Sequence, residues 1–228
     1  MPLELVPWSD ADFDHYPELT WQAFQHDLMG VLYPNGFSPL DREITAKDKR
    51  VSQRKHAQES IWMKVIDTDL PASDELGGMV SAAHWHFYTR ERSTAELDAE
   101  SKNDAEDEEE TPPGLNRAFA DQFFADIEKY RRDIMGGQPY ILLHMLVVRP
   151  SHQRRGIGSM HLTWGAEQAD KLGGLPLYLE SSPMGRRLYE RHGFEQVCEL
   201  PSDARAHGHE KDLPHVCMLR PGKKGSIA

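Results

Sequence analysis

Cysteine is scarce in this sequence, and long apolar runs are missing. Cys198 and Cys217 are the only two cysteines among 228 residues, too few for a disulfide scaffold, so we expect a reducing compartment, the cytoplasm. No stretch approaches the roughly 18 apolar residues that a membrane helix needs. Residues 1–5 lack the basic flank and apolar centre of a signal peptide. These absences predict a cytoplasmic protein that does not enter membranes.

Positive charge is also in short supply. The formal net charge is −11, and nine acids with one lysine fall between Glu96 and Glu110, a local charge of −8 that leaves −3 for the rest. Nucleic-acid partners need basic surface to meet their phosphates, so we expect none. A block of like charges is typical of a solvated, disordered loop. We therefore expect a disordered insertion at about 90–114.

The apolar pattern predicts one domain over residues 1–228 with a mixed α/β sheet. Hydrophobic residues make up 39% and charged residues 28%, a balance typical of globular domains. Apolar runs bounded by glycine and proline predict strands at 3–6, 61–66, 77–88, 140–148, 176–180, 194–200 and 215–219. Helical spacing predicts helices at 9–28, 41–60, 115–135, 158–172 and 183–193. This order differs from a doubly wound Rossmann sheet.

The sharpest local signal lies between the strand at 140–148 and the helix at 158–172. The amide groups that begin a helix lack internal partners and carry partial positive charge, so an anion such as a pyrophosphate fits there. Glycines let the main chain approach phosphates, and arginines add charge. The segment consists of Gln153, Arg154, Arg155, Gly156, Ile157, Gly158 and Ser159.

The same two glycines would also suit a tight strand-to-helix turn that binds no ligand. Two nucleotide-binding motifs need residues that this segment does not have. A Walker A loop needs Gly-Lys-Ser/Thr, which this chain lacks, and a Rossmann fingerprint needs a third glycine where His161 stands. The nucleotide-binding motifs are therefore disfavoured, and the plain turn stays an alternative.

Two motifs together resemble those of GCN5-related (GNAT) acetyltransferases. Residues 146–150 (LVVRP) followed by 153–158 (QRRGIG) resemble the family's CoA-binding core, Gln/Arg-x-x-Gly-x-Gly/Ala. Residues 185–194 (GRRLYERHGF) resemble its Leu-Tyr-x-x-x-Gly-Phe signature. The two occur in the family's order with a strand between them, which is more specific than either alone. The resemblance covers roughly residues 140–197.

The resemblance implies a GNAT fold, with a mostly antiparallel sheet that splays at the CoA site, and acetyl-CoA as co-substrate. Val148 would bind the pantetheine arm through its main chain, and the amides of 154–159 would hold the pyrophosphate. Tyr189 would protonate the leaving thiolate. Ser182 stands where the family often has Asn. The implied CoA contacts are Leu146, Val147, Val148, Gln153, Arg154, Arg155, Gly156, Ile157, Gly158, Ser159, Ser182 and Arg187.

The general base is less defined by the motifs. A protonated amine must lose a proton before it attacks, and the family's usual Glu position holds Leu142 here. His144 lies two residues on and faces the same side by strand alternation, and a histidine can accept a proton near neutrality. Arylalkylamine N-acetyltransferases are similar in having a histidine at this offset. Glu180, at the end of the next strand, is the other candidate for the base. The alternative for His144 is a core histidine bonded to a neighbouring strand, and the alternative for Glu180 is a solvated carboxylate.

Further histidines and aromatic residues are candidates for the acceptor side. His84 and His86 share one face of their strand and could line the acceptor site, against the alternative of ordinary sheet surface. We expect His84 and His86 to bind no metal, because a clear third ligand is missing. For the same reason we expect no metal site at His207 and His209. An aromatic wall for the acceptor, with helix packing as the alternative, would comprise Trp21, Phe24, Tyr33 and Phe37.

These observations predict transfer of an acetyl group from acetyl-CoA to a primary amine of a small molecule. No cysteine lies in the motifs, so direct attack in a ternary complex is expected. The alternatives are a non-catalytic acyl-CoA sensor or interaction module, a protein N-acetyltransferase, and a nucleotide-binding protein unrelated to CoA. The segment 89–139 is open to roles as a lid, a tether or the surface of a homodimer.

Overall fold

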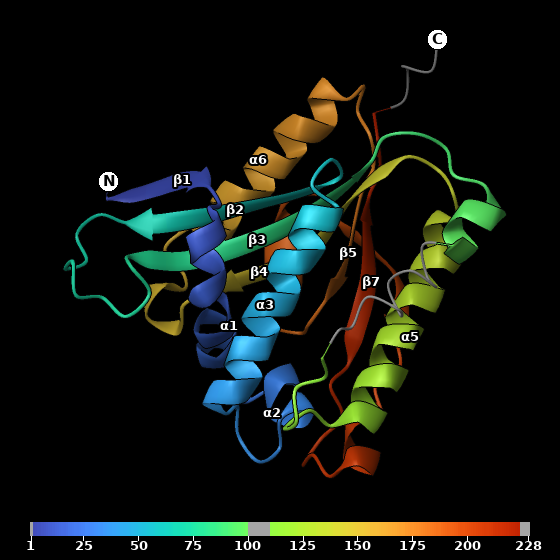
Figure 1. Cartoon of the computed structure of the whole chain (residues 1–228). Helices are drawn as coiled ribbons and strands as arrows, with labels where there is room; N and C mark the ends of the chain where they lie inside the picture. Colours follow the sequence, from blue (N-terminus) through green and yellow to red (C-terminus); the bar gives the residue numbers. More distant parts are fainter. Residues whose placement is uncertain (1, 100–109, 224–228) are drawn as a thin grey trace.

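One seven-stranded sheet organises the chain. The computed structural model describes residues 2–99 and 110–223. Its strands follow the order β1-β2-β3-β4-β5-β7-β6, and all neighbours are antiparallel except β4 and β5 (Figure 1). The strands are β1 (Leu3–Pro7), β2 (Ser60–Asp67), β3 (Met79–Tyr88), β4 (Tyr140–Val148), β5 (Leu177–Ser181), β6 (Glu195–Leu200) and β7 (His215–Arg220). The predicted mixed α/β sheet is confirmed.

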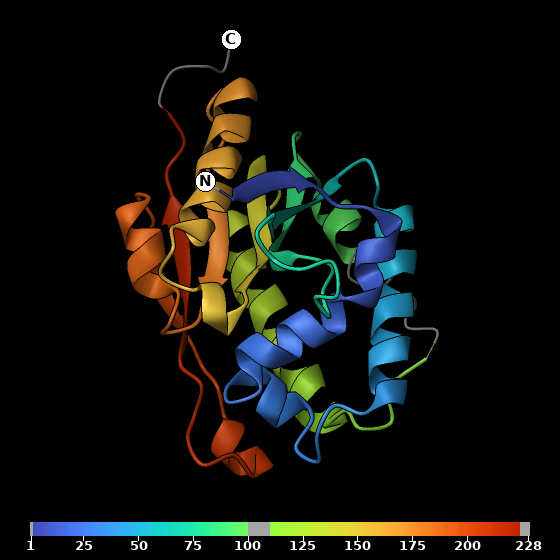
Figure 2. The same cartoon turned by 90° about the vertical axis from the view of Figure 1, so that its left-hand side faces the viewer.

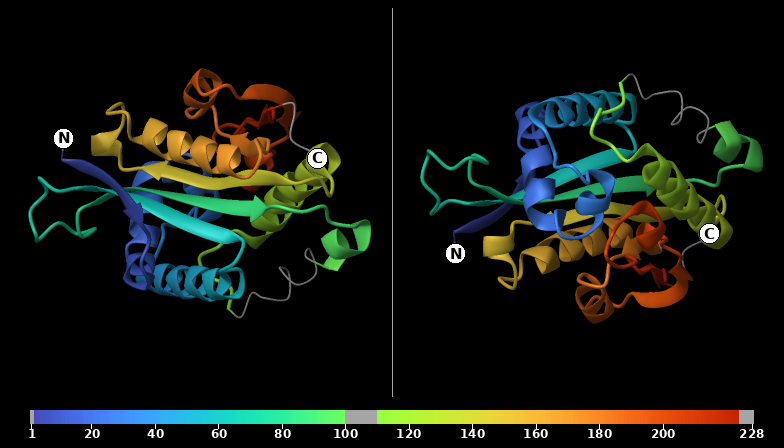
Figure 3. Two further views of the ribbon diagram at one scale, coloured as in Figure 1. Left: turned by 90° about the horizontal axis from the view of Figure 1, so that it is seen from above. Right: turned by 90° about the horizontal axis from the view of Figure 1, so that it is seen from below.

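Helices cover both faces of the sheet, with α3 and α6 on opposite sides (Figures 2 and 3). One face carries η1 (Asp10–Asp14), α1 (Tyr16–Phe24), α2 (Leu28–Leu32), α3 (Pro39–Lys55) and α5 (Arg117–Met135). The other carries α6 (Ile157–Lys171) and α7 (Arg186–Arg191). Further short 3-10 helices are η2 (Pro150–His152) and η3 (Ala204–His207). No helix within residues 2–99 and 110–223 is long and apolar enough to cross a membrane.

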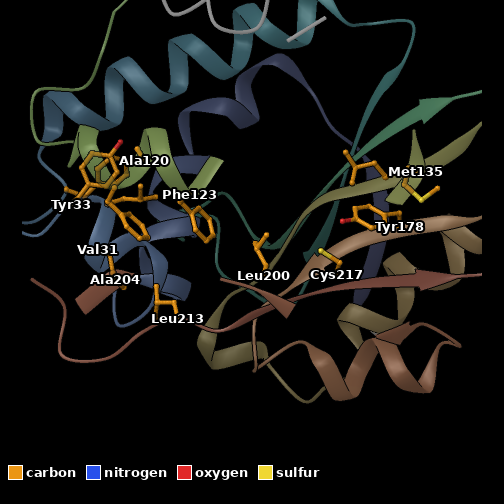
Figure 4. Packing of buried hydrophobic residues seen from close by; sticks show 14 of the residues in the cluster. Val31, Tyr33, Ala120, Phe123, Met135, Tyr178, Leu200, Ala204, Leu213 and Cys217 are labelled. Atoms are coloured by element: carbon orange, nitrogen blue, oxygen red, sulfur yellow. The ribbon is translucent and has the colours of Figure 1, made fainter. Parts of the chain in front are cut away.

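Strand β4 supplies both halves of the core. Tyr140 and Leu142 pack with α2 and α5 in the cluster shown in Figure 4. Ile141 and Leu143 pack with α6 and α7 on the other face. Side chains alternate along a strand, so an uninterrupted apolar run is what burial on both faces requires. Each large side chain buried in this way contributes about 1.5–3 kcal/mol.

The predicted helix at 9–28 was wrong as one element, because the structure divides it into η1, α1 and α2. The Asp12 carboxylate accepts hydrogen bonds from the Ser9 amide and hydroxyl at 2.6 and 2.7 Å, and this cap begins only a 3-10 turn. Pro17 has no amide hydrogen to donate to Phe13, so the chain starts a new helix there.

Helix α3 begins earlier and ends earlier than the predicted 41–60. Ser38 caps it, since its hydroxyl accepts from the Asp41 amide at 3.2 Å while the Asp41 carboxylate accepts from the Ser38 amide at 3.0 Å. Pro39 occupies the first helical position, where no amide hydrogen is needed. At the other end Ser60 pairs with His86 in the sheet, so the chain must leave the helix before it.

The predicted disordered insertion at 90–114 is wrong for residues 94–99, which are helical. Ser93 and Glu96 form a capping box: the Ser93 amide donates to Glu96 at 2.8 Å, and the Glu96 amide donates to the Ser93 hydroxyl at 3.3 Å. Residues 100–109 lie outside the described part of the chain. The helix expected at 115–135 appears as α5, and the Asn116 side chain caps it.

Candidate active site

Strands β4 and β5 are hydrogen-bonded to each other over a short length only. Their paired residues are Ile141 with Leu177, Leu142 with Tyr178 and Leu143 with Leu179. Beyond this point β4 pairs only with β3, and β5 only with β7. The end of the pairing leaves main-chain groups on the facing edges of both strands available to a ligand. The carboxyl ends of parallel strands are also where open α/β sheets bind their ligands.

A β-bulge places His144 at this point. Strand β4 shifts register against β3, since His84 pairs with Met145 and Trp85 with Leu143, which leaves His144 without a partner. An extra residue of this kind bends its strand and redirects side chains. His144 thereby joins His84 and His86 on the face that carries α3 and α5. Strand alternation predicted that His84 and His86 share a face, but neither the bulge nor the meeting of His144 with these two residues was predicted.

The three histidine rings form one cluster. Ring centroids lie 4.4 Å apart for His84 and His86, 5.2 Å for His84 and His144, and 5.6 Å for His86 and His144. Trp62 stacks on His84 at 4.1 Å. The described residues hold no group of three or more His, Cys, Asp or Glu arranged to bind a metal ion.

Hydrogen bonds fix the tautomer of His84. The Ser60 hydroxyl donates its single hydrogen to the Gln53 side-chain oxygen at 2.8 Å. It must therefore accept at its 2.6 Å contact with His84, whose Nε2 carries the hydrogen. The Nδ1 atom of His84 then has a free lone pair. The hydrogen bonds from α3 to β3 thus hold the neutral ring of one member of the cluster in a single tautomer.

All three rings are kept neutral by their surroundings. Desolvation lowers the pKa of His86 to about 3, and the positive charge of Arg131 adds to this. Desolvation, followed by His86 and Arg131, also lowers the pKa of His144 well below its usual value. His144 is nevertheless exposed to solvent, so an incoming amine can reach its ring. A neutral, accessible imidazole can accept a proton, and the lowered pKa makes it a weaker base than a histidine in water.

Glu180 is committed to an ion pair. Arg131 of α5 donates two hydrogen bonds to its carboxylate, at 3.0 and 3.1 Å. The Glu180 side chain is only 7% exposed, whereas His144 is exposed, so an incoming amine has better access to His144. The geometry therefore favours His144 over Glu180 as the base. Arg131 was missed at the sequence level, although its spacing of four from Ile127 places it on the sheet-facing side of the helix.

Tyr189 lies on α7 on the opposite face. Its ring packs on Phe194 with centroids 5.9 Å apart and is 8% exposed. Burial raises the pKa of the phenol, which keeps its proton in place. No described residue forms a hydrogen bond with the hydroxyl. A Cβ on Gly185 would come 2.6 Å from the Tyr189 ring, so the glycine makes room for it.

The loop before α6 has the backbone shape expected of an anion site. Gly156 is the N-cap in the left-handed region, with φ of 84°. Arg154 shares that region at 64° and is the only non-glycine residue to do so in the described chain. The amides at the start of α6 then point outward from the helix end. Gly158 allows α6 to pack closely on α7, because a Cβ at this position would lie 2.6 Å from Leu188.

The two arginines of this loop behave differently. Arg155, expected to add charge for phosphates, donates to the buried Asp67 carboxylate at 3.0 Å. His152 lies 3.3 Å from the same carboxylate. Arg154 is exposed and has no ion pair within the described residues. Of these two arginines, only Arg154 is therefore free to contact a phosphate.

The remaining expected CoA contacts are spread around the same end of the sheet. Leu146 and Val148 are half-buried in the part of β4 that β5 does not pair with, and Val147 is buried against α1. The Gln153 side chain donates to the Val148 carbonyl at 3.3 Å. Ser182 is half-buried and Arg187 exposed at the start of α7. A contact missed from sequence is His192 with Ser159, at 3.0 Å.

The expected aromatic wall belongs to the core. Tyr33 and Phe37 pack together at 4.4 Å inside the cluster with α5, and Trp21 lies 5.8 Å from Phe37. Phe24 packs in a separate cluster with Leu19. His207 contacts the Phe119 ring, and the His209 ring bonds the Lys211 carbonyl. Helix packing, the alternative to an acceptor wall, therefore describes all four aromatic residues.

Comparison with known proteins agrees with this geometry. The sequence model of the acetyltransferase (GNAT) domain matches residues 120–196, which span β4, the loop, α6, β5 and Tyr189. Residues 120–196 of the chain are therefore similar to the GNAT acetyltransferase domain. No curated protein sequence matches the chain.

Solved structures share the GNAT fold at low identity. Arylalkylamine N-acetyltransferase 2 from Aedes aegypti has a TM-score of 0.62 at 13% identity, covering 97% of this chain and 99% of that one. A polyamine N-acetyltransferase from Drosophila melanogaster gives 0.61 at 11%, covering 95% and 98%. YncA from Salmonella typhimurium, solved with its cofactor acetyl-CoA, gives 0.55 at 10%, covering 100% and 98%. At these identities the likenesses show the fold alone.

Proposed function

We propose that this protein transfers an acetyl group from acetyl-CoA to a primary amine of a small molecule. The observation that carries the proposal is the placing of His144, an exposed neutral histidine, where β4 and β5 stop pairing. The structure with acetyl-CoA and the two amine N-acetyltransferases share the fold, which supports the choice of donor and acceptor. We also propose that the protein is cytoplasmic. A homodimer stays a prediction, which the molar mass measured by light scattering would test.

Acetyl-CoA would lie between the separated strands. The amides at the start of α6 and the Arg154 side chain would bind its pyrophosphate. The edges of β4, at Leu146 to Val148, and of β5 would bind the pantetheine arm through main-chain groups. Ser182 and Arg187 would contact the cofactor from the start of α7. The pyrophosphate would then meet the amides that begin α6, and the pantetheine arm would meet the main-chain groups of β4 that β5 does not pair with.

The reaction follows from the groups on either side. The amine gives up a proton to His144, directly or through water, and its lone pair attacks the thioester carbonyl carbon. The carbon–sulfur bond of the tetrahedral intermediate then breaks, and the electron pair leaves with sulfur. Tyr189 donates its proton to the thiolate. The nitrogen of the new amide then gives up its second proton to water, and water returns a proton to the Tyr189 phenolate. The products are the acetylated amine and CoA, and no acyl-enzyme forms.

One observation favours a second function, an acyl-CoA sensor without turnover. The family's usual carboxylate is absent at Leu142, and the nearest carboxylate, Glu180, is bound to Arg131. A protein lacking a working base would bind acetyl-CoA and leave amines untouched. The two functions therefore share the binding step and differ in whether His144 acts.

The first experiment is isothermal titration with acetyl-CoA, with NAD and ATP as controls. Binding of acetyl-CoA alone is expected, and its absence in a folded sample would overturn the acyltransferase proposal. An amine library is then scored for acetylated product by mass spectrometry and for CoA by thiol release. His144→Gln is compared with His207→Gln, a histidine that packs on Phe119. Loss of turnover in the first variant only is expected; binding without any product would favour the sensor.

A further inference from the structure

The only two cysteines of the chain lie directly opposite each other in the sheet. Cys198 of β6 is paired with Cys217 of β7, and both thiols are free. Side chains of directly opposite residues point to the same face, and both cysteines belong to the core cluster that includes residues of α5. Figure 4 shows Cys217 in this cluster, between Leu200 and Tyr178. The acetyl transfer described above leaves both thiols without a role.

The pairing brings the two cysteines within reach of a disulfide. Directly opposite residues of antiparallel strands have Cα atoms about 4.5–5.5 Å apart, inside the range of about 4.4–6.8 Å that a disulfide needs. Their Cβ atoms, about 4.5–5.5 Å apart, must approach to about 3.5–4.5 Å. Strand β6 is at the edge of the sheet, and its register shifts between Gln196 and Cys198. Because a bulge bends its strand and disrupts the local ladder, the edge strand can make this short movement.

The surroundings of the two thiols differ. Cys217 is 0% exposed. Burial raises the pKa of its thiol to about 12, and contact with the Cys198 side chain adds to this, so Cys217 keeps its proton and is shielded from reagents in solution. Cys198 is half-buried, and a small oxidant can reach it. An accessible thiol beside a second cysteine that can resolve it is the arrangement of a reversible redox pair.

The two cysteines enclose the segment that joins β6 to β7. Residues 199–216 form most of the wall of a pocket of about 590 Å³ beyond the end of β5. Cys217 is also paired with Glu180 of β5, whose carboxylate Arg131 holds. A bond between Cys198 and Cys217 would therefore close a covalent ring around this wall, one strand away from the Arg131–Glu180 pair.

We propose that Cys198 and Cys217 are a modification site, at which a hydroperoxide converts the two thiols into a disulfide that clamps the wall of the pocket. Reversible, redox-sensing disulfides are the kind that reducing compartments contain, so the site is compatible with a cytoplasmic protein. The inference is independent of the proposed function, because it concerns the covalent state of the hairpin and holds whether or not the chain transfers acetyl groups.

The oxidation proceeds in two steps with hydrogen peroxide as the oxidant. Cys198 loses its proton to water, and its sulfur attacks one peroxide oxygen; the O–O bond breaks, which gives a sulfenic acid and a hydroxide that takes up the released proton. The sulfur of Cys217 then attacks the sulfur of Cys198 and the S–O bond breaks, while the Cys217 proton goes to the leaving hydroxide. Two thiols are thereby oxidised to one disulfide, and the peroxide is reduced to two molecules of water.

The first test treats the full chain with hydrogen peroxide, removes the peroxide and blocks the remaining thiols with iodoacetamide. Digestion and mass spectrometry should then find one peptide pair that joins Cys198 to Cys217 within a monomer, and neither cysteine alkylated. Dithiothreitol added before the block should return both thiols to the alkylated form, because it reduces the disulfide. Cysteines that both stay alkylatable after peroxide, a sulfinic acid at Cys198, or a disulfide between two chains would overturn the proposal.

Hydrogen–deuterium exchange tests the clamp. The amides of residues 201–214 should exchange about tenfold more slowly after oxidation, because local opening must now occur within a closed ring. Helix α6, on the other face of the sheet, should exchange as before. Cys198→Ser and Cys198→Ala, one polar and one apolar replacement, receive the same peroxide treatment as controls for methionine oxidation and should show no slowing. Unchanged exchange in the oxidised chain, or equal slowing in the two variants, would overturn the clamp.

Discussion

Arg131 and Glu180 join the inserted helix α5 to strand β5 through two parallel hydrogen bonds of 3.0 and 3.1 Å. Their side chains are 18% and 7% exposed. The pair therefore ties a segment outside the recognisable motifs to the strand beside the reacting centre. Removing one charge would leave the other in a poorly solvated place.

We expect Glu180→Gln to lower the free energy of unfolding by about 2–3 kcal/mol. The value is below the range for a fully buried pair, because Arg131 keeps some contact with water. Urea unfolding with an unchanged slope would measure it. Asp133→Asn, which breaks the exposed Lys129–Asp133 pair on the same helix, should cost less than about 1 kcal/mol. Equal effects of the two changes would contradict the prediction.

Tyr189→Phe should reduce kcat by about 100-fold or more, the usual size of a general-acid contribution. Stability should hardly change, because no described residue bonds the hydroxyl. Tyr16→Phe is the control: burial also raises the pKa of Tyr16, but its ring packs on Trp8 and Trp62 on the other face. Full activity in Tyr189→Phe would remove this residue from the mechanism.

Stability should fall in acid partly through His161. The ring is fully buried, and desolvation lowers its pKa to about 3, whereas an unfolded histidine titrates near 6.5. Between these values the unfolded chain binds the extra proton, so the free energy of unfolding falls as pH falls, by up to about 1.4 kcal/mol per pH unit. His161→Gln should reduce this slope in urea titrations at about pH 5 to 6.5.

The control for that slope is Ser81→Ala. The Ser81 hydroxyl contacts the His161 ring at 2.8 Å, but burial alone accounts for the lowered pKa. The variant should therefore lose some stability at every pH while keeping the slope. A slope that His161→Gln leaves intact would assign the acid sensitivity to other histidines.

Arg154→Gln should weaken acetyl-CoA binding about three- to tenfold and reduce its dependence on salt, because the exposed guanidinium meets phosphate through solvent-screened charge. Arg155→Gln is the matched change one residue away. It should act mainly on stability, through the lost contact with Asp67. Titration with acetyl-CoA at two salt concentrations distinguishes the two variants. A larger loss of acetyl-CoA affinity in Arg155→Gln than in Arg154→Gln would mean that Arg155 is the phosphate ligand.

Short-range sequence signals were enough for much of the fold. The apolar run at 140–148 marked β4 because only a strand covered on both faces needs one. The two motifs around Gly156 and Tyr189 located the loop and α7 because their backbone shapes need particular residues at fixed spacing. These features depend on neighbours in sequence, so the sequence contains them.

Features that depend on distant partners were missed. The bulge at His144 follows from how β3 and β4 pair, which no local pattern records. Arg155 was assigned to phosphate because Asp67, 88 residues earlier, was not known to lie beside it. The capping box of Ser93 and Glu96 was a local signal, but the surrounding acidic block obscured it.

The inserted segment begins and ends at one cross-strand pair, since Tyr88 is paired directly with Tyr140. A loop tethered at two adjacent points can lengthen, shorten or be exchanged without shifting the strands that carry it. It also supplies Arg131, which binds Glu180 at the end of β5, while the loop before α6 lies elsewhere in the chain. Changes between residues 89 and 139 can therefore be accommodated without altering the pairing of β3 with β4 on which the site is built.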